Sequence, residues 1–478
     1  MWPPSGDGQT VGMTMHMTPS SDISAIPGMV TDVREAFRSA ITRPLDWRRD
    51  QLKKMIALLE ENEAELLEAL RIDLGKPSAE GFITDIAFVV GEIKMMLKNL
   101  AKWNKPERVS TPLVALPAKS RRIPEPVGVV LVIAPWNYPI QLLLVPAAGA
   151  IAAGNAVVMK PSEVSSATSA VLARLVPKYL DPRAVRIIEG AVAETTALLE
   201  QHFDHIFYTG NGTVGRVVMS AAAKNLTPVT LELGGKSPTV IDESANVRVA
   251  ARRIAWGKWM NAGQTCIAPD YVLVHRSVAD RFIDEIGKAI TEFYGSDART
   301  SDSYGRVVSD RHFARLSSLM SGGKVAIGGQ TVADDRYIAP TVLVDVDVES
   351  QLMQEEIFGP LLPVITIDSI GDAVNFISSR AHPLALYVFA ENKKVVDHVL
   401  ANTTAGGVTV NGTIMHISNP SLPFGGVGES GMGAYHGKTS VRQFQHMKPV
   451  LARGTKLDPS LAYPPYTEKK IKLFRKLL

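Results

Sequence analysis

Cys266 is the only cysteine among the 478 residues of this chain. It ends the run Gly263-Gln264-Thr265-Cys266, which joins a helix-like segment to a strand-like one. A thiol becomes a nucleophile when it is partly accessible and nearby donors stabilise its thiolate, and a glycine-rich bend can provide both. A lone cysteine can equally be a small buried hydrophobic residue without chemistry. Cys266 is therefore a candidate nucleophile whose role depends on its neighbours.

A glycine motif further up the chain is a candidate dinucleotide-binding loop. Gly210, Gly212 and Gly215 fit the pattern G-x-G-x-x-G between a strand-like and a helix-like run. The usual motif opens the first βαβ unit, whereas strand-like runs already precede this one. If the motif is applied without regard to its place in the chain, Glu232, roughly 20 residues further on, would be assigned to a ribose. The late position of the motif argues against that assignment.

Lys160-Pro161-Ser162-Glu163 is an alternative cofactor site, directly after another strand-like run. At the carboxyl edge of a parallel sheet, the Glu163 carboxylate can accept hydrogen bonds from ribose hydroxyls, and the Lys160 ammonium can donate to hydroxyls or phosphate. A solvated ion pair in a loop would have the same residues. The local pattern leaves both interpretations open.

The elements that must position these residues alternate between helices and strands. Apolar residues at helical spacing predict two helices, over 47–74 and about 79–103. Short β-branched runs then predict a parallel, helix-covered sheet of the doubly wound type, with strands at 129–133, 156–159, 185–188, 205–208 and 229–233. A second alternation predicts another α/β domain that contains Cys266, with strands near 239–241, 271–274, 341–343, 362–367 and 385–389.

We therefore expect an α/β protein with a doubly wound nucleotide-binding domain, a second α/β catalytic domain and a small β bridging or oligomerisation element. Residues 1–24 are expected to be a disordered extension. The expected parts are a dinucleotide-binding domain at 25–105 and 127–232, a catalytic domain at 233–420, the bridging element at 106–126 and 421–452, and a basic tail at 453–478.

Composition excludes several classes of protein. The chain is 46% hydrophobic and 21% charged, with a formal net charge of +3, so nothing suggests a nucleic-acid partner. The longest apolar run, 140–153, is shorter than the roughly 20 residues that cross a bilayer. A single cysteine forms no internal disulfide, which favours a cytoplasmic location. His202 and His205 lack the companions of a metal motif, so no metal site is expected.

Five motifs together carry a family resemblance. They are Ala-Pro-Trp-Asn-Tyr-Pro (134–139), Lys-Pro-Ser-Glu (160–163), Leu-Glu-Leu-Gly-Gly-Lys-Ser-Pro (231–238), Gly-Gln-Thr-Cys (263–266) and Glu-Glu-Ile-Phe-Gly-Pro (355–360). In this order they resemble the aldehyde dehydrogenase superfamily. Two later motifs, Leu-Pro-Phe-Gly-Gly-Val-Gly (422–428) and Ser-Gly-Met-Gly-Ala-Tyr-His-Gly-Lys (430–438), are similar to its class 3 branch, which takes aromatic and fatty aldehydes.

The resemblance implies a catalytic role for three residues: Cys266 as nucleophile, Glu232 as general base and Asn137 as oxyanion donor. The implied chemistry is consistent. An aldehyde attacked by Cys266 becomes a thiohemiacetal, whose oxyanion the Asn137 amide and the Cys266 backbone N–H can stabilise. Loss of a hydride to nicotinamide gives a thioester, and Glu232 activates the water that hydrolyses it.

The resemblance also implies a site for NAD or NADP. Lys160 and Glu163 would hold the adenosine ribose and Glu356 the nicotinamide ribose, with Phe358 packed beside the nicotinamide. The full implied set is Trp136, Lys160, Glu163, Thr209, Gly210, Gly215, Gly234, Glu356 and Phe358. The chain departs from the class 3 motif at one place. Residues 210–215 are Gly-Asn-Gly-Thr-Val-Gly, whereas the class 3 motif is Gly-Asn-Thr-Ala-Val-Gly.

The expected activity is NAD(P)-dependent oxidation of an aromatic or medium- to long-chain aliphatic aldehyde to the acid, by a cytoplasmic homodimer. An alternative within the same chemistry transfers the acyl group to coenzyme A, which would make a base at Glu232 unnecessary. A cysteine hydrolase without a redox step and a non-catalytic binding protein are further alternatives. The basic amphipathic tail, with Ile471, Phe474 and Leu478 on its apolar side, is expected to dock on protein rather than on a membrane.

Overall fold

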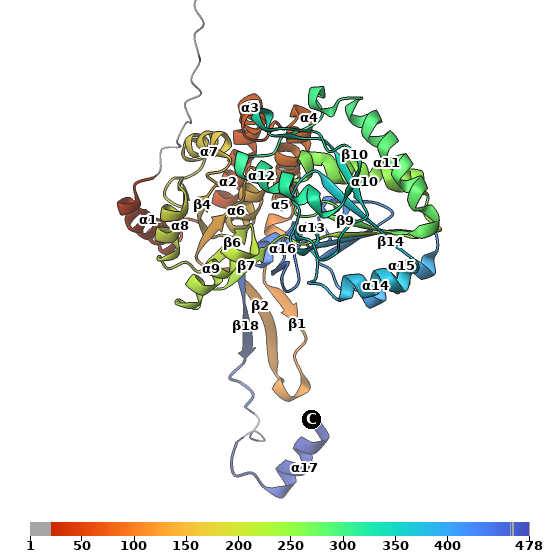
Figure 1. The fold of residues 1–478 in the computed structure, drawn as a ribbon. Coiled ribbons are helices and arrows are strands. Elements are labelled where there is room, and N and C mark those ends of the chain that lie inside the picture. The colour runs from red at the N-terminus through yellow and green to blue at the C-terminus, as the bar shows by residue number, and fades with distance from the viewer. Residues whose placement is uncertain (1–20, 459, 461–462, 478) are drawn as a thin grey trace, which may run out of the picture.

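The computed structural model describes residues 21–458, 460 and 463–477. Two large sheets with covering helices form the body, and a small third sheet projects from it as an arm (Figure 1). Residues 1–20 of the predicted disordered extension lie outside the described residues. After it, the Ser21 backbone N–H donates to the Glu189 carbonyl at 3.2 Å, and a 3₁₀ turn begins at Ile23.

The first sheet has the strand order β17-β7-β6-β3-β4-β5. Its parallel strands are β3 (Val129–Ile133), β4 (Ala156–Lys160), β5 (Val185–Ile187), β6 (His205–Thr209) and β7 (Val229–Glu232). Helices connect successive strands: α6 (Gln141–Ala153), α7 (Ser166–Tyr179), α8 (Val192–Leu199) and α9 (Gly212–Ala223). The prediction of a doubly wound sheet is confirmed. The short β17 (Gly431–Met432) pairs antiparallel with β7 at the edge.

The second sheet has the order β10-β13-β14-β9-β8-β15-β16. The predicted strands correspond to β8 (Pro238–Ile241), β9 (Tyr271–His275), β13 (Thr341–Val344), β14 (Leu361–Ile367) and β15 (Ala385–Phe389). Sequence analysis missed the two edge strands, β10 (Lys324–Ile327) and β16 (Gly407–Val410). β10 is mostly exposed and β16 is half-buried, so neither has the fully buried apolar run that identifies a central parallel strand.

The expected helix over 47–74 is two helices, α2 (Leu45–Glu61) and α3 (Glu63–Leu74). Asn62 separates them with φ −120° and ψ 22°. Its side-chain amide donates to the Leu58 carbonyl at 2.8 Å and to the Tyr179 hydroxyl at 3.0 Å. A side chain that competes for local carbonyls favours such a break, and the single-helix prediction was wrong for this reason. The second predicted helix is continuous, through α4 (Ser78–Gly81), a π-helical segment (Phe82–Ala87) and α5 (Phe88–Trp103).

The projecting arm is an antiparallel sheet of β1 (Glu107–Val109), β2 (Ala118–Pro126) and β18 (Gln445–Arg453). Residues 421–444, which sequence analysis placed with this element, instead pack into the body: Phe424 is 5% exposed and Tyr435 0%. The segment ends in α16 (Gly437–Arg442), which packs on α5 and α6. Beyond the arm lies α17 (Glu468–Leu477), with Ile471 and Leu473 exposed (Figure 1).

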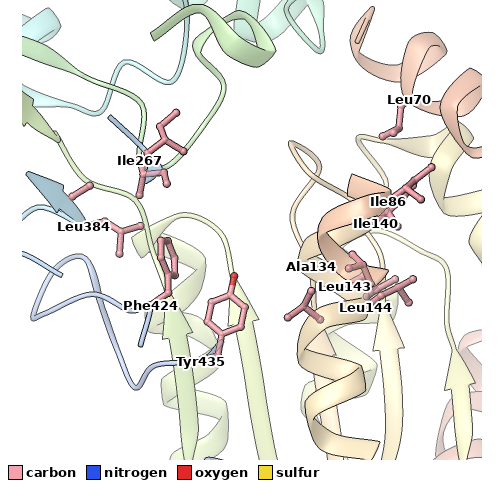
Figure 2. Close-up of a cluster of buried hydrophobic side chains, with 14 of the residues drawn as sticks. Leu70, Ile86, Ala134, Ile140, Leu143, Leu144, Ile267, Leu384, Phe424 and Tyr435 are labelled. Carbon is pink, nitrogen blue, oxygen red and sulfur yellow. The ribbon is translucent and has the colours of Figure 1, made fainter. Parts of the chain in front are cut away.

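One hydrophobic core joins the two halves of the body. It includes Val130 and Phe207 from the first sheet and Val272 and Tyr387 from the second. Figure 2 shows two groups of side chains from this core, one with Phe424 and Tyr435 and the other with Leu143 and Leu144. The rings of Phe424 and Tyr435 lie edge to face with their centroids 5.7 Å apart. Close packing across the junction restricts relative motion of the two sheets. Within the described residues, no helix combines the length and apolarity that a membrane span requires.

Candidate active site

The first sheet presents one set of predicted residues at a single edge. Because β3, β4, β6 and β7 are parallel, their carboxyl ends lie side by side. The residues at these ends or just beyond them are Trp136, Asn137, Lys160, Glu163, Thr209, Gly210 and Glu232. The ladder pairs Thr209 directly with Glu232.

The second sheet contributes the remaining residues at the amino ends of its strands, whereas the first sheet uses the carboxyl ends. Gly234 precedes β8, Cys266 precedes β9, and Glu356 and Phe358 precede β14. The two edges meet directly: the Asn137 side-chain amide donates to the Gln264 carbonyl at 3.0 Å. The rings of Trp136 and Phe358 lie edge to face at 5.3 Å. The junction of the domains therefore brings the predicted residues together.

An unusual backbone turn places Cys266. Asn261, Ala262 and Gly263 follow one another with φ of 53°, 51° and 76°. A side chain at Gly263 would collide with the Gly359 carbonyl, so only glycine fits this close approach. Residues other than glycine with positive φ are uncommon and concentrate at functional sites. The turn brings Cys266 to the amino end of β9 beside the first sheet.

The environment of Cys266 disfavours its thiolate. Burial raises the pKa of the thiol, and the carboxyls of Glu356 and Glu232 raise it further. The backbone N–H groups of Cys266 and Ile267 oppose this by hydrogen bonding to the sulfur. The residue remains partly exposed. At neutral pH the half-buried thiol is therefore mostly protonated.

Alkylation should report this pKa directly. Without cofactor, iodoacetamide should label Cys266 more slowly at neutral pH than it labels a free cysteine, because a raised pKa leaves less thiolate. The rate should go on rising with pH above about 8.5, the usual pKa of a thiol. Intact mass gives the extent of labelling without ambiguity, since no other cysteine is present. A rate that reached its plateau below about pH 8 would contradict the expected shift.

Glu232 ends β7 and is 2% exposed. Neither carboxylate oxygen has a hydrogen-bond partner among the residues that the structure describes, and the same holds for the Thr209 hydroxyl across the ladder. Burial raises the pKa of Glu232 well above the usual carboxyl value. A buried carboxyl with free oxygens and a raised pKa can accept a proton near neutral pH. This environment suits a general base better than a ribose ligand.

The backbone and the amide of Asn137 are both held in place. Its amide donates to the Gln264 carbonyl, as above, and its own carbonyl accepts from the Asn261 amide at 2.9 Å and from the Lys76 ammonium at 3.0 Å. Asn137 is 2% exposed. An amide held close to the Cys266 loop is suited to donate to an oxygen bound at the thiol.

Two predicted cofactor residues form an ion pair. The Lys160 ammonium contacts the Glu163 carboxylate at 2.8 Å, with the lysine side chain 4% exposed and the glutamate 42%. The cation is therefore fixed at the sheet edge while the carboxylate faces outward. Both open interpretations of these residues, a ribose site and a loop ion pair, are compatible with this geometry.

Glu356 lies against the backbone of Gly234. A side chain at position 234 would overlap the Glu356 carboxylate, so the glycine makes room for it. Burial raises the pKa of Glu356 to about 8; Asp270 adds to the effect, while the Gly235 N–H and Lys236 oppose it. A half-buried carboxyl beside bare backbone is a suitable acceptor for hydroxyl groups of a ligand.

The glycine motif follows β6 and opens α9, as predicted. Asn211 caps this helix by accepting from the Val214 backbone N–H at 2.9 Å. A side chain at Gly210 would overlap the Tyr208 hydroxyl, and one at Gly215 would press on Leu233. Glu163, Glu356 and the Thr209 hydroxyl, which has no partner within the described part of the chain, lie on the same junction. The residues present therefore fit a dinucleotide cofactor.

His205 has a structural environment. Its Nε2 lies 2.9 Å from the Thr230 hydroxyl, and burial lowers the pKa of His205 to about 4. In the described ranges, no group of three or more His, Cys, Asp or Glu side chains is arranged to hold a metal ion.

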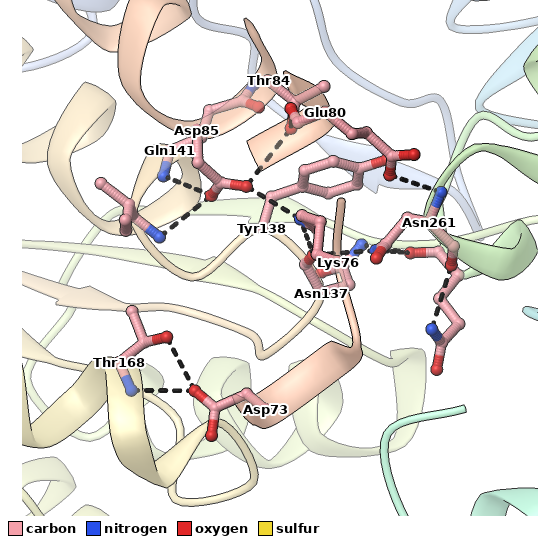
Figure 3. A network of polar contacts seen from close by, with 12 residues as sticks. Asp73, Lys76, Glu80, Thr84, Asp85, Asn137, Tyr138, Gln141, Thr168 and Asn261 are labelled. Carbon is pink, nitrogen blue, oxygen red and sulfur yellow. Dashed lines mark hydrogen bonds and ion pairs between the residues drawn. The ribbon is translucent and has the colours of Figure 1, made fainter. Parts of the chain in front are cut away.

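Sequence reasoning missed the groups that hold Asn137, namely Lys76, Asp85 and Asn261 (Figure 3). The run Gly75-Lys76-Pro77 was interpreted only as the end of a helix, and α3 does end there with Gly75 at φ 58°. The only feature of the sequence that could have indicated a further role was Lys76 itself, because Gly75 and Pro77 are enough to end the helix without it.

Comparison with known proteins agrees with the fold and the site. A model of the aldehyde dehydrogenase family matches residues 7–450. Aldehyde dehydrogenase family 3 member A2 of Mus musculus is 49% identical over 444 residues, covering 92% of each chain. The protein of Canis lupus familiaris named "aldehyde dehydrogenase, dimeric NADP-preferring" is 48% identical, covering 94% of this chain and 99% of its own. The substrate-bound Staphylococcus aureus AldH structure has a TM-score of 0.93 at 44% identity, covering 94% of this chain and 99% of that one.

Two α/β domains with a thiol, a buried carboxyl and a dinucleotide-compatible edge at their junction define a nicotinamide-dependent oxidoreductase. The chain belongs to the aldehyde dehydrogenase family. It is an enzyme that oxidises aldehydes with NAD or NADP. The prediction of the reaction class is thereby confirmed, and a cysteine hydrolase without a redox step is disfavoured.

Proposed function

We propose that Cys266 is the nucleophile of this aldehyde oxidation, Asn137 the oxyanion donor and Glu232 the general base. The observation that carries the proposal is the meeting of these residues at the domain junction, where Asn137 contacts the Cys266 loop and Glu232 is buried with both oxygens free among the described residues. After the Cys266 thiol loses its proton to solvent, its sulfur bonds to the aldehyde carbon. The electrons of the C=O π bond move to the oxygen, which becomes an alkoxide that accepts from the Asn137 amide and a backbone N–H.

The second half of the reaction uses Glu232. Loss of a hydride from the same carbon leaves a thioester on Cys266. Glu232 takes a proton from water, the resulting hydroxide adds to the thioester carbonyl, and the sulfur leaves as thiolate with release of the acid. The raised pKa of Glu232 makes it a stronger base than an ordinary carboxylate.

The cofactor would be held by the residues at the two facing edges: Trp136, Lys160, Glu163, Thr209, Gly210, Gly215, Gly234, Glu356 and Phe358. Three observations support this set: the Thr209 hydroxyl has no partner in the ranges that the structure describes, Gly234 leaves room at Glu356, and the Glu163 carboxylate faces outward. When bound, oxidised nicotinamide accepts the hydride.

Asn137→Ala should lower kcat by about 10²-fold, the usual scale for one oxyanion donor. The cofactor KM should change little, because the amide faces the Cys266 loop. Steady-state turnover at saturating aldehyde and cofactor measures the effect. Unchanged turnover would remove Asn137 from the mechanism.

Glu163→Gln should improve the use of NADP relative to NAD. The exposed Glu163 carboxylate would repel a 2′-phosphate, and the substitution removes that charge while keeping the shape. The ratio of kcat/KM for the two cofactors measures the change, with Glu200→Gln, a carboxyl at the end of α8, as a control that should leave the ratio unaltered. An unaltered ratio in Glu163→Gln would contradict this assignment.

For the substrate we propose aromatic and medium- to long-chain aliphatic aldehydes. The resemblance to class 3 enzymes suggests this range.

A turnover screen of benzaldehyde, hexanal, hexadecanal and acetaldehyde, each with NAD and with NADP, tests the substrate proposal. We expect higher kcat/KM for the first three than for acetaldehyde. The same assays with coenzyme A added would show whether the product is the acid or the thioester. Formation of acyl-coenzyme A would favour the acylating alternative.

We propose that the enzyme is a cytoplasmic homodimer. The printed name of the canine relative includes "dimeric", and the projecting arm carries exposed apolar side chains such as Val109 and Leu451. A nucleophilic thiol has to stay reduced, which suits the cytoplasm. Sedimentation velocity should give the mass of two chains, and fractionation of expressing cells should place the activity in the soluble fraction.

The tail helix α17 is proposed to dock on protein, at the dimer interface or the substrate entrance. Its exposed Ile471 and half-buried Phe474, three positions apart, give it an apolar side among basic residues, which would also suit an anionic membrane. Co-sedimentation with phosphatidylserine vesicles at low salt separates the two. Binding that depends on α17 would overturn the proposal of protein docking.

A further inference from the structure

A buried ion pair contacts the peptide that carries the proposed oxyanion donor (Figure 3). The Lys76 ammonium lies 2.8 Å from the Asp85 carboxylate, and both side chains are 0% exposed. The same ammonium donates to the backbone carbonyl of Asn137 at 3.0 Å. A charged donor makes a stronger hydrogen bond than a neutral one, so Lys76 holds this carbonyl firmly.

The network also reaches the two residues that directly precede Cys266. Asn261 donates from its amide to the Asn137 carbonyl at 2.9 Å and to the Gln264 carbonyl at 3.2 Å. The Lys76 ammonium lies 4.1 Å from the centre of the Tyr138 ring, and the Tyr138 hydroxyl is 2.6 Å from that of Thr265. Each connection leads from Lys76 to a residue just before Cys266.

Asp85 fixes the other side of the same segment. One of its oxygens accepts from the backbone N–H groups of Ile140 and Gln141, each at 3.3 Å, where α6 begins. Its other oxygen accepts from Lys76. The ion pair thus ties the Asn137 carbonyl to the first turn of the helix that follows it. The segment between them, which includes Tyr138, is held at both ends.

We propose that Lys76, paired with Asp85, is a positioning residue that aims the Asn137 amide at the oxygen bound on Cys266. This inference rests on the role of Asn137 proposed above. A buried ion pair is weak evidence for stability, because desolvation of two charges offsets most of their attraction. The contacts of this pair converge on the Asn137 segment. An error of about 1 Å in the position of a catalytic group can cost roughly 10²-fold in rate, so orientation is a sufficient reason for the pair.

The test removes both charges together, with Lys76→Met and Asp85→Asn in one chain, so that neither member of the pair is left as a buried charge without the other. The amide oxygen introduced at position 85 can still accept from the start of α6. We expect kcat to fall about ten-fold, an intermediate loss for a donor that is displaced but not removed. The cofactor KM should stay unchanged.

The decisive comparison repeats the pair removal in an Asn137→Ala background. If the pair acts through Asn137, its removal should change kcat there by less than about two-fold, because residues that act as a unit are not additive. An equal ten-fold loss in both backgrounds would overturn the inference while leaving Asn137 in its role. If Asn137→Ala alone left turnover unaltered, the proposed role of Asn137 would fail and the inference with it.

Arg48→Met is the matched control for loss of a buried cation. Arg48 is 7% exposed and donates to the carbonyls of Thr42 and Arg43 at 3.1 and 2.7 Å, on a segment away from Asn137. It should lower the unfolding temperature without lowering kcat. A ten-fold loss of kcat in this control would assign the effect to general destabilisation and overturn the inference.

Asn261→Gly is the second variant, in case the pair removal does not fold. It removes the other donor to the Asn137 carbonyl, and glycine tolerates the φ of 53° at this position. We expect a several-fold loss of kcat that disappears in the Asn137→Ala background. A loss that persists in that background would count against positioning through Asn137.

Discussion

Cys266→Ala should abolish aldehyde oxidation, with a loss of at least about 10³-fold, because no other thiol in the chain can form the covalent intermediate. Cofactor affinity should stay nearly constant, since the proposed contacts to NAD come from other residues. Production of reduced nicotinamide measures the first effect, and calorimetric titration with NAD measures the second.

The control for this variant is the labelling of the native chain. Iodoacetamide should add one group to the native protein and none to Cys266→Ala, and pre-labelled native protein should be inactive. Steady dehydrogenase activity in Cys266→Ala at more than a trace would remove the nucleophile from the mechanism.

Glu232→Gln should separate the two halves of the reaction. Attack by Cys266 and hydride loss do not need a base for water, so the first turnover should give a burst of reduced cofactor. Later turnovers should be very slow, because the thioester waits for an activated water. Intact-mass measurement after mixing with NAD and aldehyde should find an acyl group on the chain.

Glu356→Gln is the matched control, because Glu356 is a half-buried carboxyl at the same junction with a raised pKa. As a proposed ribose acceptor, its loss should raise the cofactor KM and leave no trapped acyl group. If Glu232→Gln behaved in this way, with unmodified Cys266, then Glu232 would be a cofactor ligand and not the base.

The pH dependence of kcat gives an independent measure of Glu232. A general base works only when deprotonated, so kcat should fall as the pH drops through its pKa. Since burial raises that pKa, the decline should begin at a higher pH than for a free carboxyl. The decline should vanish from the residual turnover of Glu232→Gln.

The sequence by itself determined the reaction class and most of the strands. Ordered motifs at 134–139, 160–163, 231–238, 263–266 and 355–360 are specific as a set, and the family comparison agrees. The central strands were predictable because strands buried on both faces show short β-branched runs, such as Val129–Ile133. These patterns lie within short stretches of the chain, so a single sequence is enough to detect them.

Only the tertiary structure decided how the site residues are supported. Glu232 has a raised pKa because folding buries it without a partner among the described residues, and burial is a property of the whole fold. Lys76 is hydrogen-bonded to Asn137, which is 61 positions away in the sequence, and Asn137 is hydrogen-bonded to Gln264, which is 127 positions away. Contacts of this length arise from the packing of two domains, and no local pattern of residues records which side chains that packing will bring together.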